Sequence, residues 1–406
     1  MTTPGLECLM AEIAAIRTVR TAGRVTAIGA GTVEVSGLSR EAGLGDTVSI
    51  TGAGVGEVVA IGAERVTVLA DGAAGLQLGT AVHLDGPAAI APHDGWVGRV
   101  IDPFGRPLDG LPLFRGPDAR PIDGPPPDAA LRRGLGPRME TGMEVFNTLL
   151  PIARGQRIGL FAGSGVGKST LLARLALGLQ ADLAVIALIG ERGRELRDFV
   201  ERVLGPRGLA RSVVVAATSD QSAMARRRCA AAAMAVAEHF RDRGGQVVYL
   251  ADSVTRLAEA HRDVALAAGE TGSLGGYPPS VAPVITRLCE RAGPGTGSSG
   301  DITAVFSVLV PGSDMEEPVA DILRGVLDGH VVLDRRIAER GRFPAIDVLR
   351  SVSRALPDAA SAEENALISE ARQRLGAYER SEMMVRAGLY AAGSDPAVDA
   401  ALDAWP

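Results

Sequence analysis

The pattern of apolar positions changes character along this chain of 406 residues. Residues 1–21 carry apolar side chains at helical spacing, which predicts a helix whose apolar face is formed by Leu6, Leu9, Met10, Ile13, Ile16 and Val19. Two interpretations of this face stay open: the helix packs on its own domain, or it docks a partner protein. Residues 22–88 instead contain short β-branched segments between glycine-rich turns. They predict a small closed β-barrel with strands such as 24–28, 32–35 and 65–68.

Residues 89–356 alternate apolar runs with helical segments. The apolar runs lie at 157–161, 183–189, 212–216, 246–251 and 302–310. Because buried parallel strands are apolar throughout their length, this pattern predicts an α/β domain with a mostly parallel sheet. Residues 357–406 return to helical spacing and predict a C-terminal helical domain, in which Ser394 is expected to cap the last helix.

The composition narrows the functional class. A hydrophobic fraction of 46% and a charged fraction of 22% are typical of a globular protein. The formal net charge of −6 provides no basic excess for holding nucleic acid, so no nucleic-acid partner is expected. The three cysteines, Cys8, Cys229 and Cys289, have neither disulfide nor zinc spacing, which favours a reducing compartment. No stretch has the pattern of a signal peptide or of a membrane span, so a cytoplasmic location is expected.

A glycine-rich loop between an apolar strand and an amphipathic helix is the strongest chemical signal in the chain. Its residues are Ala162, Gly163, Ser164, Gly165, Val166, Gly167, Lys168, Ser169 and Thr170. Glycines let backbone N–H groups converge on phosphates, and the helix that follows adds its positive N-terminal end. In such a P-loop, Lys168 would reach the β- and γ-phosphates and the Ser169 hydroxyl would ligate Mg²⁺.

This loop departs from the usual pattern at one position, where Ala162 replaces the first glycine. The interior glycines are present, so the pattern still predicts binding of ATP and Mg²⁺. The alternative is a glycine turn with an incidental lysine.

Two acidic residues follow predicted strands and are candidates for the same site. Asp252 ends the apolar run 247–251, at the strand end where ligands bind in such sheets, and it is a candidate for the metal side. Its alternative role is to cap an ordinary turn. Glu191 follows the run 183–189, and we expect it to orient or deprotonate the attacking water. Its alternative is a surface ion-pair cluster with the neighbouring arginines.

These motifs resemble the type III protein-export ATPases of the flagellum and the injectisome, which are similar to the catalytic subunits of rotary ATPases. The resemblance covers nearly the whole chain and is carried by the stretches 98–102, 155–169, 190–195, 252–256, 276–281, 327–330 and 338–354. It implies a multidomain fold: a small N-terminal β-barrel, a RecA-like α/β P-loop core with a mostly parallel sheet, and a C-terminal helical domain. It also implies a homohexameric ring with nucleotide at the subunit interfaces.

The resemblance further assigns roles by motif position. Glu191 matches the catalytic glutamate, Arg192 the arginine beside it and Asp252 the aspartate on the Mg²⁺ side. Arg354 matches an arginine finger that reaches a neighbour's γ-phosphate, although its own sequence context predicts only a surface arginine after a strand. Phe343 matches the aromatic residue that stacks on adenine.

The same resemblance implies partners and a location. It implies a stator-like regulatory protein at the N-terminal segment, export-gate and central-stalk proteins, secreted substrates and chaperones, and peripheral association with the export apparatus at the inner membrane. The chain ends at Trp405-Pro406, so the last helices of the C-terminal domain are expected to be short or missing.

Three functions are compatible with this sequence. The first is an ATPase that drives flagellar protein export, with the injectisome ATPase as its alternative. The second is a hexameric nucleic-acid translocase on the same core, which the acidic balance disfavours. The third is a ring subunit that does not hydrolyse ATP, against which the presence of both Lys168 and Glu191 argues.

Overall fold

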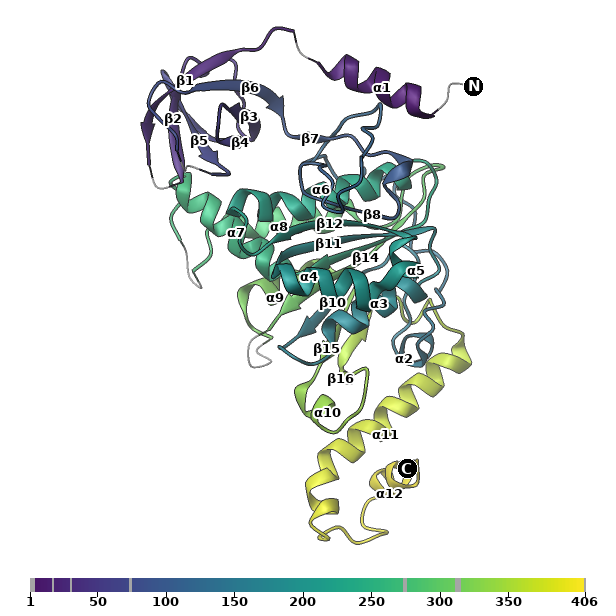
Figure 1. Cartoon of the computed structure of the whole chain (residues 1–406). Coiled ribbons are helices and arrows are strands. Elements are labelled where there is room, and N and C mark those ends of the chain that lie inside the picture. The colour runs from purple at the N-terminus through teal and green to yellow at the C-terminus, as the bar shows by residue number, and fades with distance from the viewer. Residues whose placement is uncertain are drawn as a thin grey trace.

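A computed structural model describes residues 4–16, 18–29, 31–72, 75–272, 276–310 and 315–404. The molecule is elongated: the barrel lies at one end, the α/β core in the middle and the C-terminal helices at the other end (Figure 1). Trp405 and Pro406, on which the expectation of a short C-terminus rested, lie outside the described residues. No described helix combines the length and the apolar character that crossing a bilayer requires.

The N-terminal region consists of one helix followed by a closed barrel. The helix α1 spans Pro4–Ala15. The barrel has the strand order β1-β2-β5-β4-β3-β6 and is built from β1 (Ala22–Ile28), β2 (Thr32–Ser36), β3 (Asp46–Ile50), β4 (Gly54–Ile61), β5 (Arg65–Ala70) and β6 (Ala81–Pro87). Side chains along these strands alternate between the interior and the surface, and valines such as Val35, Val58 and Val66 fill the interior. The predicted barrel is confirmed.

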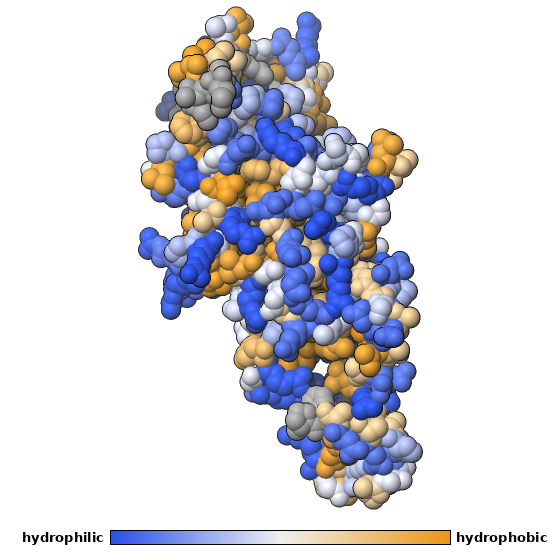
Figure 2. Space-filling view, turned by 90° about the vertical axis from the view of Figure 1, so that its right-hand side faces the viewer, coloured by the Kyte–Doolittle hydropathy of each residue, from blue (hydrophilic) through white to orange (hydrophobic). Residues whose placement is uncertain are grey.

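The apolar face of α1 is exposed. The side chains of Leu6, Leu9, Met10 and Ile13 are 47–61% exposed, whereas Cys8 is buried. Apolar surface accordingly gathers at the top of the molecule in Figure 2, at the height where α1 lies in Figure 1. Packing of this face on its own domain, one of the two interpretations of the sequence, is therefore wrong.

The core is an eight-stranded sheet of order β16-β15-β10-β14-β13-β11-β12-β8. All neighbours are parallel except β15 and β16, which confirms the mostly parallel sheet. The strands are β8 (Arg99–Ile101), β10 (Arg157–Ala162), β11 (Leu183–Glu191), β12 (Ser212–Thr218), β13 (Val247–Asp252), β14 (Ile302–Leu309), β15 (Gly329–Leu333) and β16 (Ile346–Ser353). A small antiparallel pair, β7 (Ala89–Ile90) and β9 (Arg120–Pro121), lies beside it.

Helices cover both faces of this sheet, and each face has its own apolar core. Successive residues of β11 point to opposite faces: Val185 joins the core under α6, and Ile186 joins the core under α3. One face is covered by α6 (Ala223–Arg241), α7 (Val254–Ala267), α8 (Val281–Arg291) and α9 (Pro318–Val326). The other is covered by α2 (Glu144–Asn147), α3 (Lys168–Gly178), η2 (Phe199–Leu204) and α5 (Gly205–Leu209). Short elements, η1 (Asp94–Trp96), α4 (Gly193–Asp198) and α10 (Arg335–Glu339), complete the core.

The C-terminal region is helical, as predicted. The helix α11 (Ala362–Arg386) begins with a capping box between Ser361 and Glu364. The helix α12 (Pro396–Ala404) folds back against α11 (Figure 1). Its cap differs from the prediction: Asp395 Oδ1, not Ser394, accepts from the Ala397 N–H at 2.8 Å. Asp395 directly precedes the proline that opens the helix, and this places its carboxylate over the free N–H groups.

Candidate nucleotide-binding site

The predicted glycine loop joins β10 to α3 at the carboxyl edge of the parallel strands. Gly165 and Gly167 have φ angles of 76° and 88°, in the left-handed region that residues with a side chain disfavour. Ala162 is the last residue of β10, and its methyl group is buried in the core under α3. An alanine therefore fits at the position of the usual first glycine, because this position is regular strand.

The Lys168 ammonium forms an ion pair with Asp252 Oδ1. Asp252 ends β13, only 3% of the residue is exposed, and its Oδ1 also accepts a hydrogen bond from Ser307 Oγ at 2.6 Å. A buried carboxylate needs such partners, since an unpaired charge would be costly to desolvate. The two residues, 84 positions apart in sequence, thus meet at one edge of the sheet.

Glu191 ends β11 beside this pair. The pKa of its carboxyl is raised to about 7: burial is the largest cause, the negative charge of Asp252 and a hydrogen bond with Glu195 add to it, and Lys168 opposes them. The same hydrogen bond is the main reason why the pKa of Glu195 is lowered. At neutral pH, therefore, Glu191 carries the proton of this pair for part of the time while Glu195 is ionised.

A cleft of about 740 Å³ opens above these groups. Its lining combines loop amides with basic and acidic side chains, namely Gly163, Ser164, Gly165, Gly167, Lys168, Ser169, Thr170, Glu191, Arg192, Glu195, Arg226 and Arg256. An adjoining hollow of about 500 Å³ shares Ser169 and Glu191 with the cleft and also reaches Asp252. Convergent backbone amides and cations suit a polyphosphate chain.

Arg192 lies at the mouth of the cleft. Its side chain is 78% exposed, and its Nη1 lies 3.0 Å from Glu195 Oε1. Deeper in, Arg256 pairs with Glu259 at 2.8 Å, and this hydrogen bond is the main cause that raises the pKa of Arg256. The predicted Arg192 therefore lines the cleft, and its guanidinium pairs with Glu195.

The Phe343 ring is 64% exposed and lies beside the glycine loop. An ideal Cβ placed on Gly167 would lie 3.7 Å from Phe343 Cδ1. The segment between β15 and β16 thus brings an open aromatic face to the phosphate loop, where an adenine ring could stack on it.

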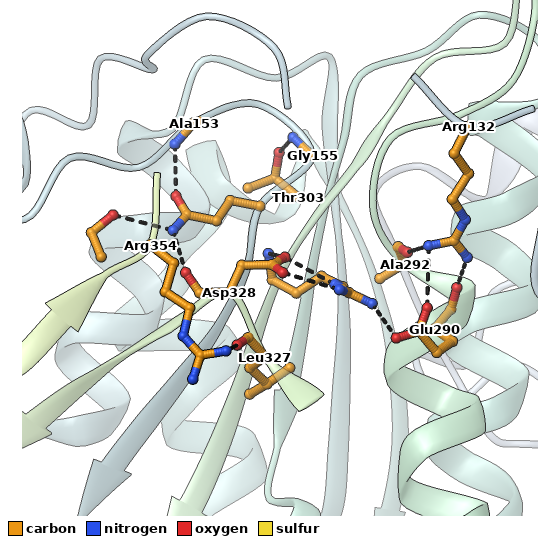
Figure 3. Close-up of polar contacts among 12 residues, drawn as sticks. Arg132, Ala153, Gly155, Glu290, Ala292, Thr303, Leu327, Asp328 and Arg354 are labelled. Atoms are coloured by element: carbon orange, nitrogen blue, oxygen red, sulfur yellow. Dashed lines mark hydrogen bonds and ion pairs between the residues drawn. The ribbon is translucent and has the colours of Figure 1, made fainter. Parts of the chain in front are cut away.

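Arg354, in contrast, lies far from the loop of its own chain. It follows β16, which runs antiparallel to β15 and pairs Ser353 with Gly329, so it lies at the amino edge of the parallel strands. The length of β10, roughly 17 Å at 3.3 Å per residue, separates the two edges. The exposed Arg354 guanidinium donates to the carbonyl of Leu327 at 3.1 Å (Figure 3). It also donates to the carbonyl of Arg324 at 3.3 Å.

The described residues include no group of three or more His, Cys, Asp or Glu side chains arranged to hold a metal ion. Ser169 and Asp252 nevertheless line one hollow beside Lys168. Mg²⁺ prefers hard oxygen ligands and keeps several waters when it binds with substrate phosphates, so few protein ligands suffice. The two residues fit a magnesium ion that arrives with the nucleotide.

Sequence reasoning missed Ser307, which holds Asp252 in place. The signal was available, because Ser307 is a hydroxyl residue near the carboxyl end of the otherwise mostly apolar, buried strand β14, the end that faces the site. The predicted Lys168, Ser169, Asp252, Glu191 and Phe343 come together around the loop, whereas Arg354 does not.

Comparisons with known proteins agree with this arrangement. Residues 142–353, more than half of the chain, match the ATP synthase alpha/beta family, nucleotide-binding domain. Residues 360–406 match the T3SS EscN ATPase C-terminal domain. The flagellum-specific ATP synthase of Caulobacter vibrioides is 44% identical over 409 residues, which cover 98% of this chain and 92% of that protein. The chain belongs to the flagellar and type III secretion ATPases of this family.

Injectisome members of these export ATPases are similar too. The SPI-2 type 3 secretion system ATPase of Salmonella typhimurium is 48% identical over 312 residues, 76% of this chain and 71% of that protein. The assembled ATPase EscN of enteropathogenic E. coli, solved in complex with its central stalk EscO, has a TM-score of 0.86 at 38% identity and covers 94% of this chain and 92% of that one. These matches confirm the predicted fold class and the prediction of a P-loop ATPase.

Proposed function

We propose that this chain is the ATPase of a flagellar protein-export apparatus and that it hydrolyses ATP with Mg²⁺ to release or unfold proteins for export. One observation carries the proposal: Lys168, Asp252 and Glu191 converge beside the glycine loop at one edge of the sheet. Flagellum-specific ATP synthases predominate among the similar proteins, and one of them covers nearly the whole chain, so the flagellar system is favoured.

In this proposal each residue of the cleft has a separate role in binding or hydrolysing ATP. The loop amides hold the phosphates, and Lys168 exchanges Asp252 for the β- and γ-phosphate oxygens. This exchange frees the Asp252 carboxylate to join the Ser169 hydroxyl in holding Mg²⁺. When bound, Mg²⁺ neutralises negative charge on the phosphate oxygens. Glu191, as a carboxylate, orients the attacking water and accepts its proton.

Two further residues complete the proposed site. Phe343 stacks on the adenine ring. Arg354 acts as an arginine finger on the γ-phosphate of a neighbouring subunit, a role in which such a residue is worth about 10³–10⁵ in rate. The support for action between subunits is that Arg354 is exposed and lies at the edge of the sheet opposite its own loop. We propose Arg192 as an auxiliary cation at the mouth of the cleft, acting through Glu195.

A finger that works between subunits requires a ring, and we propose a homohexamer. The similar protein EscN was solved as an assembly with its central stalk, which supports a ring with a stalk-like partner here. The exposed apolar face of α1 fits a stator-like regulatory protein. Export-gate proteins, secreted substrates and chaperones complete the proposed partners, at the cytoplasmic side of the inner membrane.

Glu191→Gln tests the enzymatic part of the proposal. The variant should bind a fluorescent ATP analogue as the unchanged protein does, while Mg²⁺-dependent phosphate release falls about 10²–10⁴-fold. Lys168→Arg, which keeps the charge but alters its geometry, serves as the comparison that should lose turnover as well. Normal turnover by Glu191→Gln would refute the assigned base. Restored swimming of an export-ATPase deletion strain by the unchanged chain, and not by Glu191→Gln, tests the flagellar assignment.

A further inference from the structure

A turn at the amino edge of the sheet is held by a bidentate ion pair between Arg157 and Asp328, which backbone hydrogen bonds reinforce. Asp328 lies between α9 and β15, and its carboxylate accepts from Arg157 Nε at 2.9 Å and Arg157 Nη2 at 3.0 Å (Figure 3). The backbone N–H of Arg157 donates to the same carboxylate at 3.0 Å, and the Asp328 N–H donates to the Arg157 carbonyl at 2.8 Å. Four hydrogen bonds, two from the Arg157 guanidinium and two between backbone or carboxylate groups, fix the turn to the first residue of β10.

Arg354 is hydrogen-bonded to this turn through both its backbone and its side chain. The Arg354 N–H donates to the Asp328 carbonyl at 3.0 Å, and the Arg354 guanidinium donates to the Leu327 carbonyl at 3.1 Å. Gln156, which is fully buried, donates to the same Asp328 carbonyl at 2.8 Å and lies 3.2 Å from Ser353 Oγ. Backbone and guanidinium of Arg354 are thus both held by residues that the Arg157–Asp328 pair anchors.

The anchor is well shielded, whereas the residue it supports is exposed. The side chains of Arg157 and Asp328 are 14% and 25% exposed. Burial alone would lower the pKa of the Arg157 guanidinium, but its bonds to Asp328 and Glu290 outweigh burial and raise it. Arg157 therefore stays charged, and its contact with Asp328 is geometrically fixed, since a bidentate arginine–carboxylate contact adds directional precision to the charge.

From this geometry we infer that Arg157 and Asp328 are positioning residues for Arg354, so that they set where the finger points into the neighbouring site. The inference rests on the proposed role of Arg354. A long arginine side chain reaches a transition state productively only when its base is held in place, and a displacement of about 1 Å can cost about 10²-fold in rate. The strand β10 carries this anchor at its amino end and the phosphate loop at its carboxyl end.

A double-mutant cycle in the full chain separates positioning from a general structural role. Asp328→Asn is made in the unchanged background and in Arg354→Ala, and hydrolysis of Mg-ATP is followed under single-turnover conditions at concentrations where rings assemble. The matched control is Glu290→Gln. Glu290 also pairs with Arg157, at 2.6 Å, but its other partner is Arg132 and not the turn. Binding of a fluorescent ATP analogue reports on the chain's own loop.

We expect Asp328→Asn to slow hydrolysis about 10–100-fold in the unchanged background. In the Arg354→Ala background it should change the rate by less than about twofold, because the residue it positions is gone. Nucleotide affinity should not change, and Glu290→Gln should stay within about twofold of the unchanged rate. Arg157→Lys, which keeps the charge and loses the fork, should follow Asp328→Asn.

Two results would overturn the inference while leaving the proposed finger intact: an equal loss in both backgrounds, or no loss from Asp328→Asn although Arg354→Ala is strongly impaired. A normal rate for Arg354→Ala would instead refute the finger itself, and the inference with it. The single variants and the cycle therefore distinguish the two failures.

Discussion

Replacement of Glu191 by glutamine should have opposite effects on stability and on activity. The carboxyl has a pKa of about 7 in the folded chain, against a usual 4.5, chiefly because it is buried. A group whose pKa is raised by folding stabilises the protein below its unfolded pKa, and this contribution is lost as the pH rises through the folded value. At pH 8 the folded chain therefore holds an ionised, buried Glu191 beside Asp252, which lowers the unfolding free energy. The neutral glutamine removes this destabilisation.

The size of the effect follows from the same values. The difference between about 7 and 4.5 corresponds to an upper limit of about 3 kcal/mol, at 1.36 kcal/mol per pH unit. Solvent screening in the open cleft and the opposite pKa shift at Glu195 reduce the expected gain in unfolding free energy to about 1 kcal/mol. For a domain of this size such a gain raises Tm by roughly 2 °C. The gain should develop between about pH 4.5 and 7 and should be absent below that range.

Thermal melts of Glu191→Gln and the unchanged chain, at pH 5 and pH 8 without nucleotide, measure this difference. Glu195→Gln is the matched control with the opposite expected sign, because folding lowers the pKa of Glu195 and favours its ionised form. In parallel, phosphate release should fall about 10²–10⁴-fold in Glu191→Gln. A lower Tm at pH 8, or a gain that is equal at both pH values, would refute the assignment of a buried, protonatable Glu191.

Three more outcomes are expected. Lys168→Ala removes the cation that pairs with Asp252 and should abolish binding of a fluorescent ATP analogue; an unchanged Kd would contradict its phosphate role. Phe343→Ala should raise KM for ATP about tenfold with little change in kcat, since stacking on a base is worth about 1–3 kcal/mol; an unchanged KM would place adenine elsewhere. Glu238→Gln breaks the buried ion pair with Arg291, in which both hydrogen bonds are 2.8 Å long. The variant should lower the unfolding free energy by about 3 kcal/mol. A loss below about 1 kcal/mol in urea titrations would contradict this expectation.

Local sequence determined the elements and the loop chemistry of this protein. Strands such as β11 and β13 were predictable because a buried parallel strand is apolar at every position, and barrel strands because they alternate. The loop around Gly165 and Lys168 was predictable because its function depends on adjacent residues in one segment. Roles that depend on such short-range patterns need no knowledge of the fold.

Only the tertiary structure decided which distant residues meet. The strand order brings Asp252, Lys168 and Ser307 together from three separate segments. The antiparallel pairing of β16 carries Arg354 to the edge opposite its own loop. No periodicity within a segment specifies either result, because hydrogen-bonded register between strands joins residues that are far apart in the chain. The exposure of α1 has the same cause: an apolar face is visible in sequence, but whether another surface covers it depends on the packing of the whole molecule.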